Sequence, residues 1–511
     1  MAAPYLVHHL LQHDADTDAR LALIDGARTL SYGDFRRQVD DCGRRLRAAG
    51  IARGDRVAIL LPKGIEECCA IFGASRAGGV FVPVNPLLRP AQVKHIVEDC
   101  TARVLITNAA LLKTLGDTFD DTPGLTVICI DSDDAAVDTA PLAPSTAIGE
   151  DLAAILYTSG STGRPKGVML SHRNLVAGTR IVRTYLGIGA TDRILSILPF
   201  SFDYGLNQLL TAVEQSAATV LLTFRFGDDI VRAIRDHNCT GLAGVPTVWS
   251  ILTRAAPLLA KTPLPSLRYI TNSGGAVPSD TVRKLRDMLP DTRIFLMYGL
   301  TEAFRSTFLP PDEIDNRPTS IGKAIPECEV FAVTADGRRT KPGEPGILVH
   351  RGPTVSLGYW NRPDDTARVL RQNPLMPATF GGEIVCFSGD LVTEDDEGFL
   401  YFVGRDDAMI KSSGYRISPT EVEEVLMSTG HFRQVAVIGL PDPMAGQKVH
   451  AVGVARDGAV DVPVTLKAVS ERLPAFMLPR DIELVEELPV TANGKVDYKS
   501  LVAQRASHGG H

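Results

Sequence analysis

The sequence predicts an α/β fold, with a large N-terminal domain of layered α/β subdomains and a β-rich subdomain, followed by a small α+β domain. Three observations lead to this expectation. The chain has 511 residues, whereas a single hydrophobic core stops growing near ~250–300 residues. Short apolar, β-branched runs alternate with amphipathic stretches, which favours largely parallel sheets covered by helices. Past Gly404 a polar stretch opens a unit of different character.

The expected elements follow in chain order. In the N-terminal domain, helical spacing at 64–77 and 89–99 lies between buried strands, and the strands are expected at 56–61, 80–84, 104–107, 152–157, 193–198, 218–223, 268–271 and 293–297. The stretch from about 347 to 403 is β-rich. The last unit should hold a helix beginning at 418–421, a helix at 465–473, and strands at 434–440, 449–454 and 481–486. We predict the boundary at 405–407, which gives domains of 1–406 and 407–511.

Composition and charge exclude several classes of protein. Hydrophobic residues make up 44% and charged residues 22% of the chain, which excludes intrinsic disorder. The net charge of −7 makes general nucleic-acid binding unexpected, because phosphates require a basic surface. No apolar run reaches the ~20 residues of a membrane helix, and the first residues lack a signal-peptide pattern, so membrane insertion is not expected. Eight cysteines without a CxxC motif predict reduced thiols and a cytoplasmic location.

Residues 158–167 predict a phosphate-binding loop. Glycines let backbone amides turn around an anion, hydroxyl groups add donors, and Lys166 adds a positive charge; the sequence is Thr158-Ser159-Gly160-Ser161-Thr162-Gly163-Arg164-Pro165-Lys166-Gly167. The pattern fits neither a Walker A loop nor a nucleophile elbow. A Ser/Gly linker is the alternative, which the flanking strands and the Pro-Lys-Gly disfavour. The composition suits a polyphosphate.

This string resembles the signature of the AMP-forming adenylating enzymes, which include acyl-CoA synthetases, adenylation domains of peptide synthetases and firefly-type luciferases. Later motifs of that family appear in order, and the resemblance runs from about residue 20 to 501. They are Asn272-Ser273-Gly274-Gly275-Ala276, Tyr298-Gly299-Leu300-Thr301-Glu302, Ser388-Gly389-Asp390, Gly404-Arg405-Asp406-Asp407 with Lys411 and Gly414-Tyr415-Arg416, and Asn493-Gly494-Lys495. Ser388 departs from the family, where Thr is usual.

The resemblance implies that ATP activates a carboxylate by attack on its α-phosphate, which releases pyrophosphate and leaves an acyl-adenylate. It implies that Glu302 holds Mg²⁺, that Thr301 donates to the α-phosphate, and that Lys166 binds the outer phosphates. The other implied ATP-binding residues are Thr158, Ser159, Gly160, Ser161, Thr162 and Gly163 at the phosphates, Gly274, Gly275, Ala276, Tyr298 and Gly299 near adenine, and Asp390, Arg405 and Lys411 near the ribose and the hinge. Without the motif context, Tyr298 would be a core residue and Asp390 a loop cap.

The resemblance also implies that the C-terminal domain is mobile. Lys495, which alone would be a surface lysine at a hairpin tip, is the implied catalytic lysine that reaches the α-phosphate and the attacking carboxylate. Asp407 matches the hinge position of the family. After rotation, Ser413, Gly414 and Tyr415 would line a tunnel for the pantetheine thiol of coenzyme A or of a carrier protein, although Gly414 could also be a simple turn glycine.

The substrate pocket is expected after Leu198-Pro199. Asp203 falls where amino-acid-activating members hold the substrate ammonium, but it also precedes an amphipathic run, so a helix N-cap is the open alternative. The other pocket candidates are Phe202, Asn207, Trp249, Asn272, Ser273, Phe304 and Arg305. The string Phe304-Arg305-Ser306-Thr307 resembles two subgroups equally: stand-alone prolyl-type carrier-protein ligases and acyl-CoA ligases associated with exosortase and exopolysaccharide systems.

These expectations define an AMP-forming acid–thiol ligase. It would use ATP and Mg²⁺ to adenylate a small carboxylic acid, plausibly an amino acid such as proline, and pass it to coenzyme A or to a phosphopantetheinyl carrier protein. The alternative substrate is a fatty or aryl acid. A catalytically silent nucleotide-binding homologue is disfavoured, because Lys166, Glu302, Asp390, Arg405 and Lys495 are all present. Luciferase-like oxidation of the adenylate is the remotest alternative.

Overall fold

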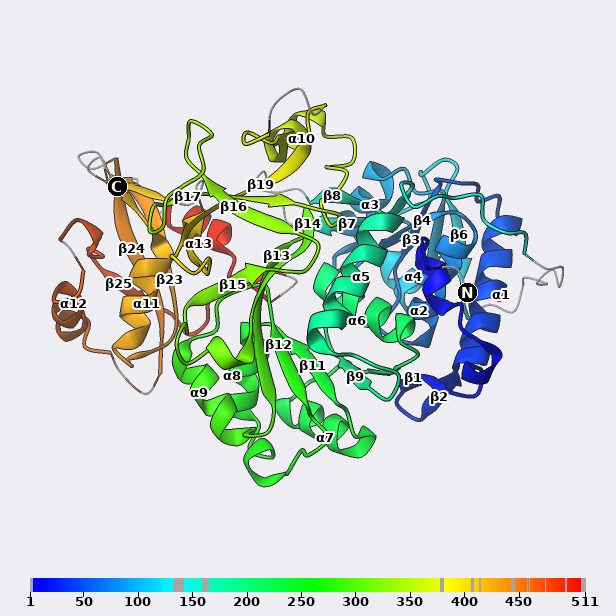
Figure 1. Cartoon of the computed structure of the whole chain (residues 1–511), viewed down its shortest axis with the longest axis horizontal. Coiled ribbons are helices and arrows are strands. Elements are labelled where there is room, and N and C mark those ends of the chain that lie inside the picture. Colours follow the sequence, from blue (N-terminus) through cyan, green and yellow to red (C-terminus); the bar gives the residue numbers. More distant parts are fainter. Residues whose placement is uncertain are drawn as a thin grey trace. The chain divides into compact units, whose positions relative to one another are not determined.

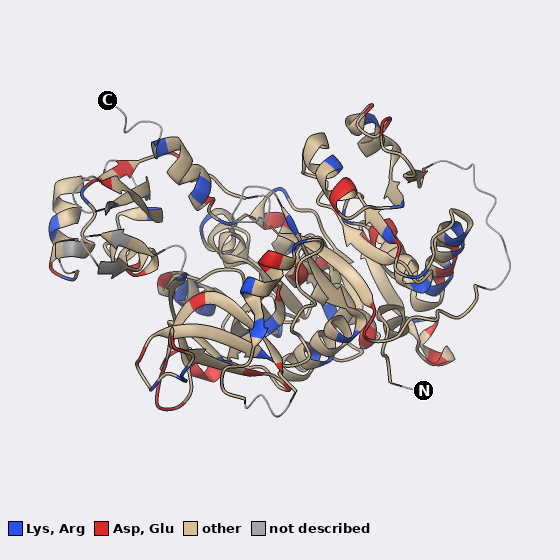
Figure 2. Cartoon of the chain, turned by 90° about the horizontal axis from the view of Figure 1, so that it is seen from above, with Lys and Arg blue, Asp and Glu red and all other residues tan. Residues whose placement is uncertain are grey.

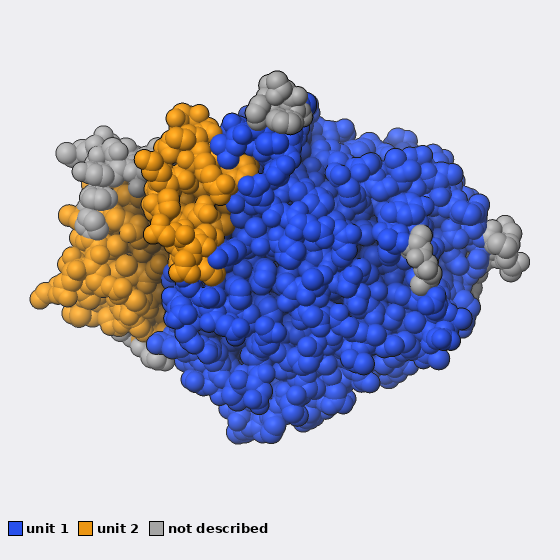
Figure 3. All heavy atoms as spheres, in the orientation of Figure 1, with its two compact units in different colours: residues 1–330, 350–386 blue, residues 331–349, 387–511 orange. Residues whose placement is uncertain are grey.

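Figure 1 shows the computed structural model of the chain. It describes all residues except 1–2, 132–141, 159–164, 377–380, 406–408, 413–414, 443–445, 457, 459, 474, 492–493 and 507–511. The chain divides into two compact units, Met1–Val330 with His350–Cys386, and Phe331–Val349 with Phe387–His511 (Figure 3). The predicted boundary at 405–407 lies within the sequence of the second unit. That these residues act as a hinge stays a prediction. Basic and acidic residues are interspersed along the elements of both units (Figure 2).

The first unit contains a six-stranded sheet in the order β6-β5-β3-β4-β7-β8. Its strands are β3 (Arg56–Ile59), β4 (Val80–Pro83), β5 (Val104–Thr107), β6 (Thr126–Cys129), β7 (Leu152–Thr158) and β8 (Lys166–Ser171). The β-branched runs of β4 and β5 are buried throughout, as expected of parallel strands covered on both faces. All neighbours in this sheet are parallel except β7 and β8, which pair antiparallel.

A second sheet of this unit runs in the order β15-β14-β13-β12-β11-β9-β10-β1-β2. Its strands are β1 (Leu21–Asp25), β2 (Arg28–Ser31), β9 (Arg193–Ser196), β10 (Ala218–Leu221), β11 (Gly241–Gly244), β12 (Tyr269–Asn272), β13 (Arg293–Leu300), β14 (Ala303–Leu309) and β15 (Ser320–Ala324). The strands from β1 through β13 along this path are parallel, whereas β14 and β15 are antiparallel. Predicted site residues therefore follow the carboxyl ends of parallel strands, where ligands of open α/β sheets bind.

Helices flank both sheets, with α7, α8 and α9 beside β9–β13 in Figure 1. The helices of this unit are α1 (Tyr32–Ala48), α2 (Ile65–Arg76), α3 (Pro90–Asp99), α4 (Ala109–Leu115), α5 (His172–Leu186), α6 (Asp203–Glu214), α7 (Gly227–His237), α8 (Pro246–Ala255), α9 (Ser279–Met288) and α10 (Pro363–Val369), with 3₁₀ turns at Val7–Leu11, Ala15–Thr17, Leu259–Lys261 and Pro311–Glu313. A capping box begins α5: the backbone N–H of Asn174 donates to Ser171 Oγ, and that of Ser171 donates to Asn174 Oδ1. This fixes where α5 leaves β8.

The second unit carries β-structure and a small α+β part. Its strands and those that enter it are β16 (Glu329–Val333), β17 (Gly346–Arg351), β19 (Ile384–Glu394), β20 (Leu400–Arg405), β21 (Ile410–Ser412), β22 (Tyr415–Ile417), β23 (Phe432–Asp442), β24 (Gly446–Ala455) and β25 (Ile482–Leu484), while β18 (Leu370–Gln372) belongs to the first unit. The helices are α11 (Pro419–Ser428), α12 (Val462–Ser470) and α13 (Tyr498–Ala506), with a 3₁₀ turn at Ala475–Met477. Ser418 caps α11 as predicted.

The α/β class with a large first part and a smaller last part is confirmed, and local boundaries differ. Helix α12 begins three residues earlier than predicted, because Asp461 is its N-cap and Pro463 stands in its first turn. Helix α10 interrupts the stretch predicted to be β-rich. Within the part of the chain that the structure describes, no helix is long and apolar enough to cross a membrane.

Candidate functional site

The predicted phosphate loop connects two antiparallel strands. Thr158 at the end of β7 pairs with Lys166 at the start of β8. Gly167 lies where a side chain could not fit, because a Cβ there would lie 2.5 Å from Ile155 Cγ2. The predicted ligands Ser159, Gly160, Ser161, Thr162 and Gly163 lie outside the described residues. The structure therefore fixes both ends of the loop.

Lys166 forms an ion pair with Asp365 of α10. Its Nζ lies 2.8 Å from Asp365 Oδ2, and the two side chains are only 11% and 20% exposed. The same Nζ lies 5.7 Å from the centroid of the Tyr359 ring. The loop lysine is thus held by a carboxylate that the sequence analysis did not identify.

Glu302 is hydrogen-bonded to Tyr359, whose hydroxyl donates to Glu302 Oε1. Burial, and after it the Glu302 carboxylate, raises the pKa of Tyr359 well above its usual value. The main-chain carbonyl of Glu302 accepts from the N–H of Ser356 at 2.9 Å. Lys166, Asp365, Tyr359 and Glu302 therefore form one connected cluster, although they come from three separate stretches of sequence.

Sequence reasoning missed Tyr359 and Asp365. The available signal was Gly358-Tyr359-Trp360, an aromatic pair between turn residues, five residues before Asp364-Asp365 in the first turn of α10. Polar and aromatic side chains on connecting segments are more often functional than those in the core.

The donor chemistry of this cluster fits Mg²⁺. Magnesium in nucleotide sites takes one or two protein carboxylates together with phosphate oxygens, and Glu302 offers such a carboxylate. Within the described residues there is no group of three or more His, Cys, Asp or Glu side chains arranged for a metal ion. A magnesium ion at Glu302 would complete its coordination with phosphate oxygens and water.

Hydrogen bonds of Asn272 hold the predicted adenine-side loop in place. Asn272 at the end of β12 donates from Nδ2 to the carbonyl of Gly275 at 2.8 Å, and its Oδ1 accepts from Trp249 Nε1 at 2.9 Å. Gly274 has φ +84°, a left-handed conformation that favours glycine. Trp249 and Asn272, predicted to line the substrate pocket, thus hold the glycine loop in place.

Tyr298 stacks on His350. The ring centroids are 6.2 Å apart and the planes are inclined by 18°. His350 is buried, and burial lowers its pKa to about 3. Its two ring nitrogens have no hydrogen-bond partner within the described part of the chain. The imidazole is therefore a neutral platform behind the predicted adenine-binding tyrosine.

The second unit brings together the two predicted ribose ligands. Asp390 of β19 is the register partner of Arg405 of β20, and Arg405 Nη1 lies 3.2 Å from Asp390 Oδ1. Ser388, which departs from the family's Thr, accepts from the N–H of Asp390 at 3.0 Å and donates to the carbonyl of Leu348 at 2.8 Å. The serine hydroxyl therefore orders the turn that presents Asp390.

Lys495 lies on an exposed turn of the second unit. Its carbonyl accepts from the N–H of Thr491 at 2.7 Å, and Val490 and Val496 form an antiparallel bridge. Gly494 has φ +75°. Residues on both sides of the predicted turn are thus paired, while Asn493 lies outside the described residues. The hinge residue Asp407 and the tunnel residues Ser413 and Gly414 lie outside the described residues, as do the side chains of Lys411 and Tyr415.

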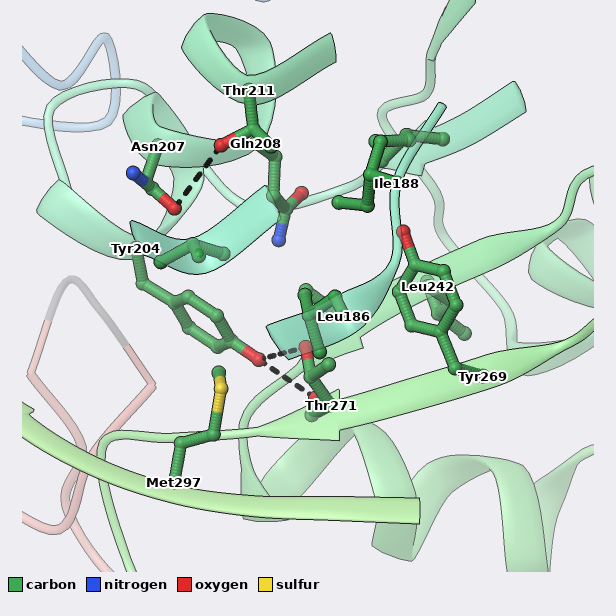
Figure 4. A pocket seen from close by; sticks show the side chains of 13 residues that line it. Leu186, Ile188, Tyr204, Asn207, Gln208, Thr211, Leu242, Tyr269, Thr271 and Met297 are labelled. Carbon is green, nitrogen blue, oxygen red and sulfur yellow. Dashed lines mark hydrogen bonds between the residues drawn. The ribbon is translucent and has the colours of Figure 1, made fainter. Parts of the chain in front are cut away.

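A small cavity of about 20 Å³ lies beside α6 (Figure 4). It is lined by Val182, Leu186, Ile188, Ile194, Tyr204, Asn207, Gln208, Thr211, Leu242, Ala243, Tyr269, Thr271 and Met297. The Tyr204 hydroxyl donates to the carbonyl of Thr271 at 2.7 Å. Of the predicted pocket residues, Asn207 lines this cavity. Phe304 instead belongs to the core, where its ring fills the space beside Gly178 of α5.

Asp203 pairs with Arg305. Arg305 Nη2 lies 3.6 Å from Asp203 Oδ2, and both side chains are buried. The helix-cap interpretation of Asp203 is wrong by one position, because Phe202 is the N-cap of α6 and Asp203 is the first helical residue. Phe202 is half-buried, while Ser273 is buried directly after β12.

Comparisons with known proteins agree with this arrangement. Residues 11–360 match the family model of the AMP-binding enzyme, and residues 421–495 match that of the AMP-binding enzyme C-terminal domain. The chain is 32% identical to a feruloyl-CoA synthase of Amycolatopsis sp, covering 93% of this chain and 94% of that protein. It is 31% identical to an L-proline–[L-prolyl-carrier protein] ligase of Streptomyces coelicolor, covering 98% and 96%.

Longer proteins and solved structures also match. The chain spans only 8% of the length of tyrocidine synthase 3 of Brevibacillus parabrevis, to which it is 30% identical over 97% of its own length. The crystal structure of ATP-bound MatB from Rhodopseudomonas palustris is similar with a TM-score of 0.89 and 26% identity, covering 99% of each chain.

Proposed function

The chain belongs to the AMP-binding enzyme family, and from this membership we propose that it is an AMP-forming acid–thiol ligase. It adenylates a small carboxylic acid with ATP and transfers the acyl group to the pantetheine thiol of coenzyme A or of a carrier protein. The observation that carries the proposal is the cluster of Lys166, Asp365, Tyr359 and Glu302 at the ends of the phosphate loop and of β13.

In this proposal Lys166 leaves Asp365 to bind the outer phosphates of ATP, helped by Thr158 and the loop residues 159–163. Thr301 donates to the α-phosphate, where negative charge spreads in the transition state. Glu302 holds Mg²⁺, which neutralises phosphate charge when bound, and Tyr359 orients the carboxylate through its hydroxyl. Tyr298, backed by His350, stacks on adenine beside Gly274, Gly275 and Ala276.

Residues 407–511 act as the mobile domain. Asp390 and Arg405 bind the ribose, and Lys495 approaches the reacting carboxylate during adenylation. Rotation at Asp407 then exchanges Lys495 for Ser413, Gly414 and Tyr415, which line the way for the thiol. The thiol loses its proton to solvent and attacks the acyl carbon, a C–S bond forms, and AMP leaves with the electron pair of the broken acyl–oxygen bond.

The proposed compartment is supported by the cysteines. None of the eight cysteines forms a disulfide in the part of the chain that the structure describes. Free thiols persist where glutathione and thioredoxin keep them reduced, which supports a cytoplasmic enzyme.

The class of acid is the open part of the proposal, because the names of the relatives include both an amino-acid ligase and an aryl-acid ligase. An amino acid would require Asp203 to pair with the substrate ammonium, and the ion pair with Arg305 weighs against that role. A fatty or aryl acid would require no such charge.

Hydroxamate formation tests the proposed function. The protein is incubated with ATP, Mg²⁺, hydroxylamine and a mixture of short fatty, hydroxy, aryl and amino acids, and the acyl-hydroxamates are identified by mass spectrometry. We expect at least one hydroxamate, formed only when ATP is present. No hydroxamate with any acid, combined with measurable ATP binding, would favour the catalytically silent alternative.

A further inference from the structure

Asp203 and Arg305 form a buried charge pair with unused hydrogen-bonding capacity. Their side chains are 6% and 3% exposed, and the Nη2–Oδ2 distance of 3.6 Å is an ionic contact too long for a hydrogen bond. The guanidinium carbon lies 4.6 Å from the centroid of the Tyr204 ring. A buried guanidinium normally satisfies its donors, so this arrangement leaves room for a further acceptor.

The backbone holds this arginine in an uncommon conformation. Arg305 has φ +78° inside β14, next to a register shift between β13 and β14. A non-glycine residue in the left-handed region is strained, and bulged strands commonly redirect a side chain near a functional site. The negative charge of Asp203 is stabilised by the dipole of α6, because its carboxylate lies in the first turn of that helix.

The buried polar atoms near this pair are mainly donors. On Arg305 and the segment 201–208, the atoms without a hydrogen-bond partner within the described part of the chain are the donors Arg305 Nε, Arg305 Nη2, Asn207 Nδ2 and Gln208 Nε2, the acceptor Gln208 Oε1, and the Ser201 hydroxyl, which can donate or accept. Asn207 and Gln208 lie on α6, one turn after Asp203, and Figure 4 shows the Gln208 amide directed into the cavity. A ligand that satisfies most of these atoms must therefore supply oxygen acceptors.

Size and charge restrict that ligand further. The cavity of about 20 Å³ has room for about one water-sized group. Tyr204 links it to the charge pair, because its ring lines the cavity and stacks against Arg305. A substrate ammonium would meet the positive charge of Arg305, and a second substrate carboxylate would meet the negative charge of Asp203. An uncharged oxygen group meets neither repulsion.

We propose that Arg305 takes the place of a substrate ammonium beside Asp203, and that the acid activated here carries a small uncharged oxygen group, a hydroxyl or carbonyl, and no amine. The inference rests on the proposed ligase function. It makes Arg305 and Asp203 together the determinants of substrate class: the pair is neutral as a whole and presents donors to the distal oxygen of the acid.

Four acids with the same carbon chain test this inference: 3-hydroxybutanoate, butanoate, 3-aminobutanoate and succinate. We measure acid-dependent ATP–pyrophosphate exchange, and separately the affinity of the corresponding acyl-sulfamoyl adenosines by calorimetry. The native protein should prefer the hydroxy acid by about tenfold or more, because groups left unpaired in the other complexes are costly. A preference for butanoate, 3-aminobutanoate or succinate in both measurements would overturn the inference.

Variants give a reciprocal test. Arg305→Met removes the charge and keeps an apolar stem, so Asp203 becomes available and 3-aminobutanoate should gain about tenfold or more relative to the hydroxy acid. In Arg305→Met/Asp203→Asn this gain should vanish. Asp203→Asn alone leaves Arg305 uncompensated and should favour succinate. The matched control is Arg183→Met, which removes an arginine paired with Glu214 at the far end of α6 and should leave the ranking unchanged.

The outcomes separate this inference from the proposed function. If the sulfamoyl adenosines bind but rank in the wrong order, only the inference about the acid fails. If none of them binds and no exchange occurs, the ligase function fails and the inference falls with it. Should Arg305→Met not fold, as judged by its melting transition, the native ranking and the Asp203→Asn shift still decide the question.

Discussion

Lys166 of β8 and Asp365 of α10 form a largely buried ion pair 2.8 Å long at the edge of the predicted phosphate site. A carboxylate in this position competes with phosphate for the lysine. Binding of ATP must therefore displace Asp365 or share Lys166 with it, and the pair sets part of the cost of nucleotide binding.

Replacing Asp365 with Asn should strengthen ATP binding. The substitution removes a negative charge that would repel the phosphates and frees Lys166, which should lower the Kd for ATP by roughly tenfold, or about 1.4 kcal/mol. Calorimetric titration with ATP and Mg²⁺ measures the change. Asp364→Asn is the matched control, since Asp364 is exposed on the same turn. Weaker ATP binding in Asp365→Asn would show that the aspartate supports the nucleotide site.

Replacing Tyr359 with Phe should raise the magnesium requirement. The change keeps the ring and removes the hydroxyl that donates to Glu302, and loss of a group that orients a metal ligand typically weakens metal binding by about 10–100-fold. Pyrophosphate exchange measured as a function of Mg²⁺ concentration should show a higher half-saturation point, with the rate recovered at high Mg²⁺. An unchanged magnesium dependence would separate Tyr359 from the metal site.

Replacing Lys495 with Ala should impair adenylation far more than thiol transfer. A charge aimed at the transition state is lost, which should cost about 3–4 kcal/mol in kcat/KM of the first half-reaction. Transfer from a synthetic acyl-adenylate should be nearly unaffected, because Lys495 has then moved away. Lys499→Ala, which removes an exposed lysine in the first turn of α13, is the control. Equal loss in both half-reactions would contradict the two-state scheme.

Glu423 of α11 should make the stability of the protein pH-dependent. Its Oε1 accepts from the N–H of Val437 at 2.7 Å and from the hydroxyl of Tyr498 at 2.9 Å, and burial raises its pKa to about 7. The folded state therefore binds a proton more tightly than the unfolded state, so stability is lost as the pH rises from about 4.5 to 7. Glu423→Gln should remove this loss, about 1–3 kcal/mol, relative to the native chain. Melting measured at pH 4.5 and 8 checks this, and an equal shift in the native and variant chains would refute the prediction.

Local sequence patterns were sufficient to predict much of the fold. The β-branched runs at 80–84 and 104–107 could be assigned because a buried parallel strand has no other common explanation, and Ser418-Pro419 marks a helix start by its own chemistry. The motif residues on strand ends were instead found through their resemblance to the motifs of the adenylating-enzyme family. The start of α12 was misplaced because Val462 and Pro463 lie outside the apolar periodicity that defined it.

Contacts between distant segments could not be predicted. Asp203 and Arg305 are separated by about a hundred residues, and their pairing depends on the strained turn of β14. Trp249 and Asn272 were placed in the pocket as single residues, whereas their mutual hydrogen bond makes them supports for the glycine loop. Such pairs arise from packing, which a linear pattern does not encode.

The antiparallel pairing of Thr158 with Lys166 has an entropic consequence for nucleotide binding. The ladder between β7 and β8 brings the two ends of the phosphate loop together when the sheet folds, so the loop-closure entropy is lost during folding and not during ligand binding. ATP therefore binds at a loop whose two ends are already paired. Insertions in this loop should weaken binding gradually, whereas substitutions that break the β7–β8 ladder should abolish it abruptly.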